Sequence, residues 1–279
     1  AALRAGNYSA RAPVEGQDEV AQLQSDFNAM ADELERSLHA LQAERDRVAS
    51  LLDARRTLVA NVSHELRTPV ATVRAALESS VDRWDETPPE QLRANLEVMQ
   101  GEVLRLQGLI DDLFTLSRAD VGGLPIQCAP VNVGEVACRM VEALAPLAWR
   151  SGRVQVITDL PEGLPHASAD EGRLEQVLAN LLRNAIRHTP PGGIVVLRAA
   201  AATGCVQIQV CDTGEGIAPE DLHHIWERFY RGENGRQRDA AGAGLGLALV
   251  KELTEAMGGT VAVESSAGEG SCFTVTLTL

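Results

Sequence analysis

Apolar residues recur at every seventh position through the first part of the chain. The seam consists of Val20, Leu23, Phe27, Met30, Leu34, Leu41, Val48 and Leu51. Charged residues surround it, and this pattern predicts a coiled coil. One amphipathic helix packed on its own domain would show a similar stripe. That alternative is weaker, because no helix cap or breaker interrupts residues 19–68.

The seam changes phase near residue 52. A new seven-residue series consists of Leu52, Val59, Leu66 and Val73. Arg55 stands where the first series would continue. Such a stutter locally unwinds a coiled coil. Our hypothesis is that this junction transmits a signal from upstream residues.

Two helices are predicted to form a hairpin after this junction. The first runs to about Asp82, and Thr87 is placed to cap a second helix over 89–119. The apolar stripe of the second helix consists of Leu92, Leu96, Met99, Val103, Leu106, Ile110, Leu113 and Leu116. Two antiparallel helices with one apolar face each form half of a four-helix bundle. We therefore expect a homodimer to supply the other half.

The pattern changes after a glycine-rich hinge at Gly122–Pro125. Helical patterns at about 133–150, 170–188 and 244–257 alternate with short strand patterns. The predicted strands are Val154–Thr158, Ile194–Ala199, Val206–Cys211, Thr260–Glu264 and Cys272–Leu279. This alternation predicts an α+β sandwich, with helices on one face of a mixed sheet.

Composition narrows the class of protein. The 279 residues suffice for about two domains. The net charge of −14 argues against direct nucleic-acid binding, which needs a basic surface. No apolar run is long enough to cross a membrane, and the first residues do not resemble a signal peptide. The chain starts in a polar, half-patterned segment, so we expect it to be part of a longer protein.

The cysteines show no spacing typical of a metal or redox motif. The five residues are Cys128, Cys138, Cys205, Cys211 and Cys272, and no two of them form a C-x-x-C pair. Most of them lie in apolar runs. We therefore expect reduced, buried cysteines in a cytoplasmic protein.

The segment Ser63–Pro69 places a histidine beside a carboxylate. His64 and Thr68 are four residues apart and share one face of the helix. Glu65 is placed to orient or deprotonate one ring nitrogen of His64, which leaves the other nitrogen as a nucleophile. His64 lies off the apolar seam and should face solvent, and Pro69 should bend the helix just beyond it. A lone histidine usually has no special role, but this cluster suits a phosphate acceptor.

Four clusters in the second region point to a nucleotide site. In the first, Asn180 and Asn184 lie one helical turn apart, and Arg187 and His188 follow on the next turn. An amide oxygen is a suitable ligand for Mg²⁺, and Arg187 is placed to meet a phosphate. Two asparagines on a helix would ordinarily be polar surface, so this cluster alone is a weak signal.

The second cluster, at Asp212, Gly214 and Gly216, closes a predicted strand. The carboxylate of Asp212 is placed to accept a hydrogen bond from an exocyclic amine. The two glycines allow the backbone to approach a ring closely. A lone D-x-G-x-G is more often a turn than a ligand site.

The third cluster contains Trp226 and Phe229, which we expect to be mainly core anchors. It leads into a stretch rich in glycine and arginine with Arg236 and Arg238. In an acidic protein, this local excess of arginine fits a mobile lid over a triphosphate.

The fourth cluster, at Gly242, Gly244, Leu245 and Gly246, opens a helix. Its backbone donors and the helix dipole can hold phosphates. Such glycines more commonly bind dinucleotides, but no βαβ unit with an acidic residue about 20 positions further on follows them. Chance explains the order and spacing of all four clusters badly, and together they favour a nucleotide site.

Together with residues 63–69, these clusters resemble the sensor histidine kinases of two-component systems over essentially the whole chain. Residues 63–69 are similar to the H box of that family, and the later clusters to its N, G1, F and G2 boxes. Gly268–Phe273 resembles the glycine-rich hairpin that closes the Bergerat ATP-binding fold of the GHKL ATPases. Asp18–Val20 and Phe27–Met30 resemble part of a HAMP linker.

The resemblance implies a division of the chain into four parts. Residues 1–50 would be a partial HAMP linker and signalling coiled coil, and residues 51–121 a dimerisation and histidine-phosphotransfer domain. Residues 122–130 would be a hinge, and residues 131–279 the catalytic ATP-binding domain. The whole would be the soluble cytoplasmic portion of an inner-membrane protein, a homodimer that uses ATP and Mg²⁺ and phosphorylates a response regulator.

The resemblance also implies roles for individual residues. His64 would accept the phosphoryl group, Glu65 would be its acid/base partner, and Thr68 would orient water for response-regulator dephosphorylation. Asn184 would bind Mg²⁺, and Asp212 would read the adenine amine. The other residues placed in the nucleotide site are Asn180, Arg187, His188, Gly214, Gly216, Arg238, Gly242, Gly244, Leu245 and Gly246.

Two positions depart from the family pattern. Trp226 stands where phenylalanine is usual, a change that should be tolerated, and Cys272 stands where a polar residue is common.

Other functions remain compatible with parts of the sequence. A conformational ATPase of the GHKL group would leave residues 63–69 unexplained. A non-catalytic dimeric scaffold predicts loss of Asn184, Asp212 or the glycines, yet all of these are present. A protein that acts mostly as a phosphatase would keep His64, Glu65 and Thr68.

Overall fold

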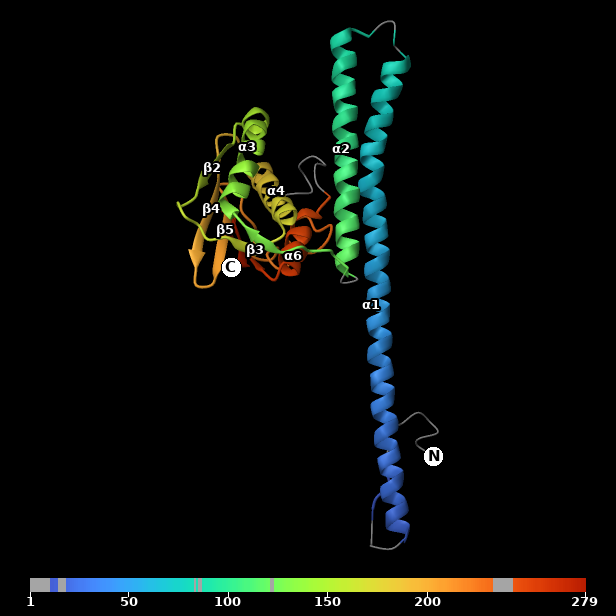
Figure 1. Cartoon of the computed structure of the whole chain (residues 1–279). Helices are drawn as coiled ribbons and strands as arrows, with labels where there is room; N and C mark the ends of the chain where they lie inside the picture. Colours follow the sequence, from blue (N-terminus) through green and yellow to red (C-terminus); the bar gives the residue numbers. More distant parts are fainter. Residues whose placement is uncertain (1–10, 15–18, 83, 85–86, 121–122, 233–242) are drawn as a thin grey trace. The chain divides into compact units, whose positions relative to one another are not determined.

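The structure is a computed structural model that describes residues 11–14, 19–82, 84, 87–120, 123–232 and 243–279 (Figure 1). It divides into two units, residues 1–63 and 64–279, which are considered separately below. The first unit contains most of the first helix, α1 (Glu19–Asp82), whose remaining residues belong to the second unit. The prediction of an uninterrupted helix to about residue 82 is confirmed.

In the first unit, residues 11–14 are tied to α1 by polar contacts. The guanidinium of Arg11 pairs with the carboxylates of Asp32 and Glu35, the latter at 2.6 Å. The side chain of Asn28 accepts from the Ala12 N–H at 2.8 Å and donates to the Ala12 carbonyl at 2.9 Å. Asn28 therefore serves as a surrogate backbone partner for this short segment.

The predicted seam of α1 is not covered by the described residues of its unit. All eight seam residues are exposed, with Leu41 at 68% and Phe27 at 42%. Burying a leucine is worth about 1.5–3 kcal/mol, so a stripe of this length is suited to a partner surface.

The second unit begins with a helical hairpin formed by residues 64–82 of α1 and by α2 (Pro89–Asp120). The amide of Asn95 donates to the hydroxyl of Ser80 at 2.9 Å. Further from the turn, Arg105 pairs with Glu65 at 3.6 Å. Glu65 precedes Ser80 on α1, whereas its partner Arg105 follows Asn95 on α2. The two helices are therefore antiparallel, as predicted.

The rest of the second unit is a two-layer α/β domain. Its main sheet has the strand order β2-β4-β5-β7-β6, in which β2 and β4 are parallel and the other neighbours antiparallel. The strands of this sheet are β2 (Gln155–Asp159), β4 (Ile194–Ala202), β5 (Cys205–Asp212), β6 (Thr260–Ser266) and β7 (Gly270–Thr278). The predicted mixed sheet is therefore confirmed.

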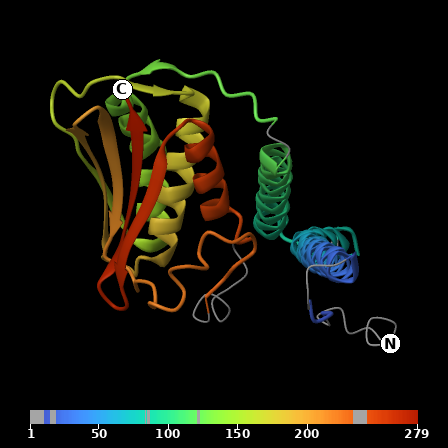
Figure 2. The ribbon, with the colours of Figure 1, turned by 90° about the horizontal axis from the view of Figure 1, so that it is seen from below.

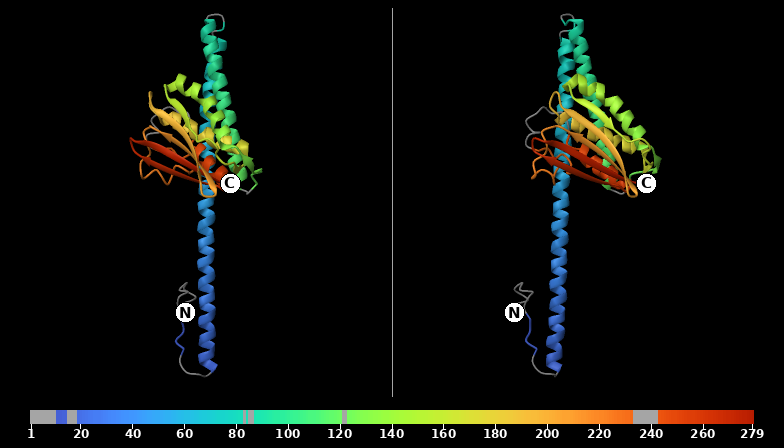
Figure 3. Two further views of the ribbon diagram at one scale, coloured as in Figure 1. Left: turned by 60° about the vertical axis from the view of Figure 1, so that its left-hand side comes forward. Right: turned by 90° about the vertical axis from the view of Figure 1, so that its left-hand side faces the viewer.

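Three helices cover one face of this sheet (Figure 2). They are α3 (Val133–Gly152), α4 (Glu171–His188) and α6 (Gly246–Ala256). With the sheet turned toward the viewer, no described helix crosses its other, outer face (Figure 3, right). The described helices of this domain therefore lie on one face of the sheet, as the sequence predicts.

The core of the α/β domain lies between the sheet and the three helices. On β5, Val206, Ile208 and Val210 are fully buried, and the intervening residues are not. The same alternation continues on β7 through Phe273, Val275 and Leu277. Strand periodicity of two thus sends every second residue inward.

Two short strands were missed by the sequence prediction. β1 (Ala129–Val131) pairs antiparallel with β3 (Ala167–Ala169) in a separate two-stranded sheet. Three residues are too few to establish an alternating pattern.

The prediction of reduced, buried cysteines is wrong. Cys211 and Cys272 are joined by a disulfide, Cys128 and Cys138 are exposed, and Cys205 is half-buried. The cause is strand register, because β5 and β7 place Cys211 directly opposite Cys272, with Cα atoms 4.0 Å apart.

None of the described helices combines the length and apolar character needed to cross a bilayer.

Candidate functional site

The histidine motif lies on the solvent side of α1. His64 is exposed, as predicted, and the Thr68 hydroxyl donates to the His64 carbonyl at 3.4 Å. Glu65 is half-buried, and its carboxylate pairs with Arg105 of α2, which also pairs with Glu102. Arg105 was not among the predicted site residues, because it lies in the second predicted helix, outside every motif.

Helix α4 carries the predicted amide pair on one edge of the core. Leu178, Leu181 and Leu182 are fully buried, whereas Asn180 and Asn184 are half-buried. This placement follows from the strongly amphipathic sequence of α4, which is capped by Asp170 through the Arg173 N–H at 3.2 Å. The amides therefore border the site rather than the solvent face of the domain.

Asn180 marks the place where α4 meets the start of α6. Its Nδ2 donates to the Gln176 carbonyl at 3.0 Å. Its Oδ1 would lie 3.2 Å from a Cβ placed on Gly246, the first residue of α6. Glycine at this position leaves room for the amide beside the unpaired N–H groups of a helix N-terminus.

Asp212 is the most buried carboxylate among the predicted site residues. It is 9% exposed, and its Oδ1 accepts from the Gly214 N–H at 2.8 Å and the Ser271 N–H at 3.3 Å. Burial raises the pKa of Asp212, although both backbone hydrogen bonds act to lower it. Ser271 was not among the predicted site residues, and the glycine-rich hairpin before it was the available signal.

Glycines allow three backbone segments to converge around Asp212. A Cβ on Gly214 would lie 2.5 Å from the His188 carbonyl oxygen. A Cβ on Gly216, which has a left-handed φ of +67°, would lie 1.9 Å from the Ser266 carbonyl oxygen. Gly270 approaches the Asp212 carbonyl equally closely. In the described structure these glycines let two backbone segments approach each other closely. The sequence analysis had assigned Gly214 and Gly216 to close approach of the backbone to a ligand ring, which stays a prediction.

The end of α4 is joined to the loop after β5. The ring Nδ1 of His188 lies 2.8 Å from Oε1 of Glu215, and the Glu215 N–H donates to the His188 carbonyl. Arg187 precedes this histidine. Arg187 is exposed as a residue, but partial desolvation of its guanidinium and then the positive charge of Arg231 lower its pKa. Two arginines therefore lie near one another beside the site, a suitable setting for an anion.

The aromatic cluster is connected to the last glycine cluster. The Phe229 N–H donates to the Gly244 carbonyl at 2.8 Å, and both residues have left-handed φ angles. Trp226 packs edge-to-face against Phe273, with ring centroids 6.0 Å apart, which confirms its anchoring role. Leu245 is fully buried before α6. Arg238 and Gly242 lie outside the described residues.

These side chains suit a nucleotide better than a protein-built metal site. A buried carboxylate, helix N-terminal N–H groups, amide oxygens and arginines lie in one part of the domain. The described residues contain no group of three or more His, Cys, Asp or Glu side chains that could hold a metal ion. The half-buried amide of Asn184 is an oxygen donor of the kind that Mg²⁺ accepts when phosphate supplies its other ligands.

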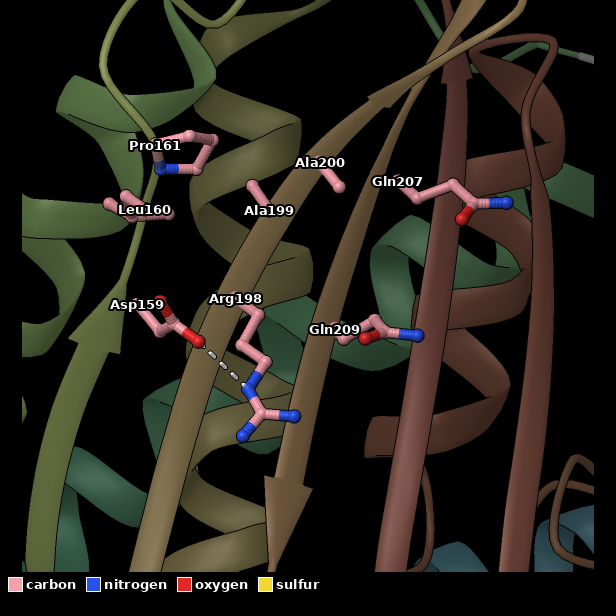
Figure 4. Close-up of a pocket in the computed structure, with 8 residues that line it drawn as sticks. All are labelled: Asp159, Leu160, Pro161, Arg198, Ala199, Ala200, Gln207 and Gln209. Carbon is pink, nitrogen blue, oxygen red and sulfur yellow. Dashed lines mark ion pairs between the residues drawn. The ribbon is translucent and has the colours of Figure 1, made fainter.

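A cavity of about 280 Å³ lies elsewhere, on the outer face of the sheet (Figure 4). Arg198 and Asp159 form an ion pair there at 3.2 Å, beside Gln207 and Gln209. Because these glutamines alternate with the buried residues of β5, they face away from Asp212. The cavity is therefore separate from the site around Asp212.

Three protein families match successive parts of the chain. Residues 1–36 match the HAMP domain, and residues 54–122 match the His Kinase A (phospho-acceptor) domain. Residues 169–279 match the family described as histidine kinase-, DNA gyrase B-, and HSP90-like ATPase. Their order agrees with the order of the motifs.

Curated proteins give the same result. The sensor histidine kinase MtrB of Mycobacterium bovis is 34% identical over 274 residues, which are 98% of this chain and 47% of that protein. The circadian input-output histidine kinase CikA of Synechococcus elongatus is 34% identical over 202 residues, 71% of this chain and 27% of that protein. The chain thus spans about half or less of the length of these relatives.

Solved structures agree with both comparisons. The Acinetobacter baumannii histidine kinase AdeS is 25% identical with a TM-score of 0.61, over 77% of this chain and 97% of that chain. Full-length ShkA in complex with AMPPNP is 32% identical with a TM-score of 0.59, over 78% of this chain and 44% of that chain. The ordered families, the curated relatives and the fold agree, and the chain belongs to the sensor histidine kinases of bacterial two-component systems.

Proposed function

We propose that this chain binds ATP and Mg²⁺ in its α/β domain and transfers the γ-phosphoryl group to His64. The phosphoryl group then passes to an aspartate of a separate response regulator. The observation that carries the proposal is the presence, on one chain, of an exposed His-Glu-x-x-Thr helix and the buried Asp212 carboxylate in its glycine-lined surroundings. We further propose that it works on the cytoplasmic side of a membrane-anchored sensor.

Asp212 is assigned to adenine. Its Oδ1 already accepts from two backbone N–H groups, and we assign Oδ2 to the exocyclic amine of the base. A buried carboxylate acceptor discriminates well, because a base without that amine leaves the carboxylate without a donor. The solved structure of full-length ShkA is a complex with AMPPNP, which supports nucleotide binding by this chain.

The phosphates are assigned to the region between α4 and α6. The N-terminus of α6 offers backbone donors at Gly246, and Arg187 adds positive charge. Asn184 would hold Mg²⁺ with Asn180 beside it, and the ion would neutralise phosphate charge. We assign Arg238 and Gly242 to the lid from the sequence alone.

The phosphoryl transfer needs an exposed nucleophile and a nearby base. One ring nitrogen of His64 forms a bond to the γ-phosphorus while the bond to the β–γ bridging oxygen breaks, and ADP leaves. Glu65 takes the proton from the other ring nitrogen, and Arg105 keeps that carboxylate in place. Positioning and charge neutralisation carry most of this catalysis.

The helical part is assigned to dimerisation. The α1 seam and three α2 stripe residues, Leu96, Val103 and Ile110, are exposed in a single chain. A second copy would cover these stripes as a four-helix bundle and a coiled coil. We place the boundaries at residues 1–50 for the linker, 51–121 for the phosphoacceptor domain, 122–130 for the hinge and 131–279 for the catalytic domain.

Incubation with γ-labelled ATP and Mg²⁺ tests the proposal. We expect label on the protein that is acid-labile and base-stable, as a phosphohistidine is. His64→Gln should lose all of it while it still binds ATP. Label that persists in His64→Gln would refute the assignment, and ATP hydrolysis without any protein label would favour a conformational ATPase.

We also propose that the chain dephosphorylates its response regulator, with Thr68 orienting the water. Thr68→Ala should keep autophosphorylation and lose phosphatase activity, measured as phosphate release from phosphorylated regulator. Thr68→Ser retains the hydroxyl and should keep both activities. Equal loss of both activities in Thr68→Ala would make Thr68 a structural residue, consistent with its hydrogen bond to the His64 carbonyl.

A further inference from the structure

Two cysteines lie directly behind the proposed adenine site. We propose that Cys211 and Cys272 form a thiol–disulfide modification site that sets the affinity of the α/β domain for ATP. This inference rests on the proposed function, because the regulated ligand is the nucleotide assigned to Asp212. It is carried by the register of two strands and by the two faces of the sheet.

The cysteines and the site residues alternate across the sheet. On β5, Val210 and Asp212 are buried while Cys211 between them is only half-buried. On β7, Ser271 and Phe273 are buried while Cys272 is half-buried. The disulfide therefore lies on the outer face of the sheet, which no described helix crosses (Figure 3). Because both cysteines are only half-buried, a small solute can reach them from that side.

The disulfide is positioned by the fold itself. β5 and β7 pair antiparallel along their whole length, and this register sets Cys211 opposite Cys272. The other three cysteines have no cysteine opposite them, and Cys205 at the far end of β5 faces Thr278. One specific pair is therefore available for intramolecular oxidation.

The bond is one residue away from both partners of a site hydrogen bond. Asp212 follows Cys211, and Ser271, whose N–H donates to Asp212, precedes Cys272. The disulfide ties the two strands together at this pair. Reduction removes that tie, so it should let the strand ends separate and weaken the Ser271 contact, which is already long at 3.3 Å.

The oxidant we invoke is a small-molecule disulfide such as oxidised glutathione. The thiolate of one cysteine attacks it, forming a mixed disulfide and releasing one small thiolate. The second cysteine then attacks the protein sulfur of that mixed disulfide and releases the other small thiolate. Two protein thiols are thereby oxidised and one small disulfide is reduced to two thiols. An excess of small thiol reverses both steps.

The test compares nucleotide affinity of the whole chain in its two states. A background with Cys128, Cys138 and Cys205 changed to serine keeps only the proposed pair. Oxidised glutathione should remove both titratable thiols without cross-linking one chain to another, which non-reducing gels and intact mass would verify. By calorimetric titration, reduction should weaken binding of a non-hydrolysable ATP analogue about fivefold, at the low end of ordinary site-to-site coupling.

The matched control is Cys211→Ser/Cys272→Ser, which should bind the analogue equally under both conditions with the affinity of the reduced pair. Equal affinity of the oxidised and reduced pair would overturn the proposal, as would tighter binding after reduction or failure of the pair to oxidise. If no form binds the analogue, the proposed function itself fails. The two failures are therefore distinguishable.

Discussion

The helical part and the α/β domain place the same kinds of residue in opposite environments. Leu41 of α1 is 68% exposed, whereas Leu181 of α4 is 1% exposed. Both belong to regular apolar patterns, but only the α/β domain satisfies its pattern within one chain. We infer from this difference that the first pattern is built for the proposed dimer interface, whereas the second specifies a core.

The chemical groups follow the same division. His64 is exposed on a helix, as its proposed role requires, while Asp212 is buried and its carboxylate accepts from two backbone N–H groups. Substitutions should therefore act differently in the two parts. In the α/β domain they should change stability and nucleotide affinity. In the helical part they should change assembly and phosphoryl transfer.

The largest contrast is expected from two glycine-to-alanine changes. Gly216→Ala places a Cβ 1.9 Å from the Ser266 carbonyl oxygen at a left-handed φ. It should lower the free energy of unfolding by about 3 kcal/mol, since the backbone must shift as well as tolerate strain. A Cβ on Gly101 of α2 meets nothing within 4 Å, so Gly101→Ala should raise the free energy of unfolding by about 1 kcal/mol. Urea unfolding measures the free energy of unfolding of both variants. If the two substitutions change it equally, the predicted difference between the two positions is wrong.

A smaller but more specific effect is expected at Asp212. Asp212→Asn keeps an acceptor for the Gly214 and Ser271 N–H groups but presents a donor to the adenine amine. ATP binding should weaken about ten- to a hundredfold, the range expected for losing a hydrogen bond to a charged group. Calorimetric titration measures this, and unchanged affinity would move the adenine site elsewhere.

The raised pKa of Asp212 also predicts how the stability of the domain and its ATP affinity change with pH. A raised pKa means that the folded state prefers the protonated form. That contribution to stability is present below the ordinary pKa and is lost as pH rises through the raised pKa. Asp212→Asn should therefore cost no stability at neutral pH, while wild-type ATP affinity should fall as acid protonates the carboxylate. A destabilised Asn variant would show that the charge is structural.

The smallest effect is expected at the α1 seam. Leu41→Gln should weaken dimerisation by about 1.5 kcal/mol per chain. Leu41 is exposed in a single chain and would be buried only in the proposed dimer, so the substitution removes burial from the dimer alone. Ala43→Gln, exposed and off the seam, is the matched control and should leave the dimer unchanged. Sedimentation equilibrium measures both. Equal weakening by the two changes would mean that the stripe does not form the interface.

The sequence predicted the long, periodic elements well. Helix α4 was expected over 170–188 and runs from Glu171 to His188, and β4 and β6 begin at their predicted residues. Periodicity and caps are local properties, so they are legible in one sequence. The candidate site residues on α4 and after β5 were proposed from the same local patterns, and their roles stay predictions.

Features that depend on long-range register were not predicted. The disulfide requires β5 and β7 to align Cys211 with Cys272, and the Ser271 hydrogen bond to Asp212 requires the same alignment. The pairing of Glu65 with Arg105 depends on how two helices pack. These alignments join residues that are far apart in the sequence, so no local pattern in one sequence reveals them.

The central claim is that chemistry is divided between an exposed histidine and a separate nucleotide site. The most direct measurement is to determine ATP affinity and acid-labile label on the same preparations of wild type, His64→Gln and Asp212→Asn. We predict that His64→Gln binds ATP normally and carries no label, and that Asp212→Asn loses both in proportion. Label on His64→Gln, or normal ATP binding by Asp212→Asn, would contradict the account.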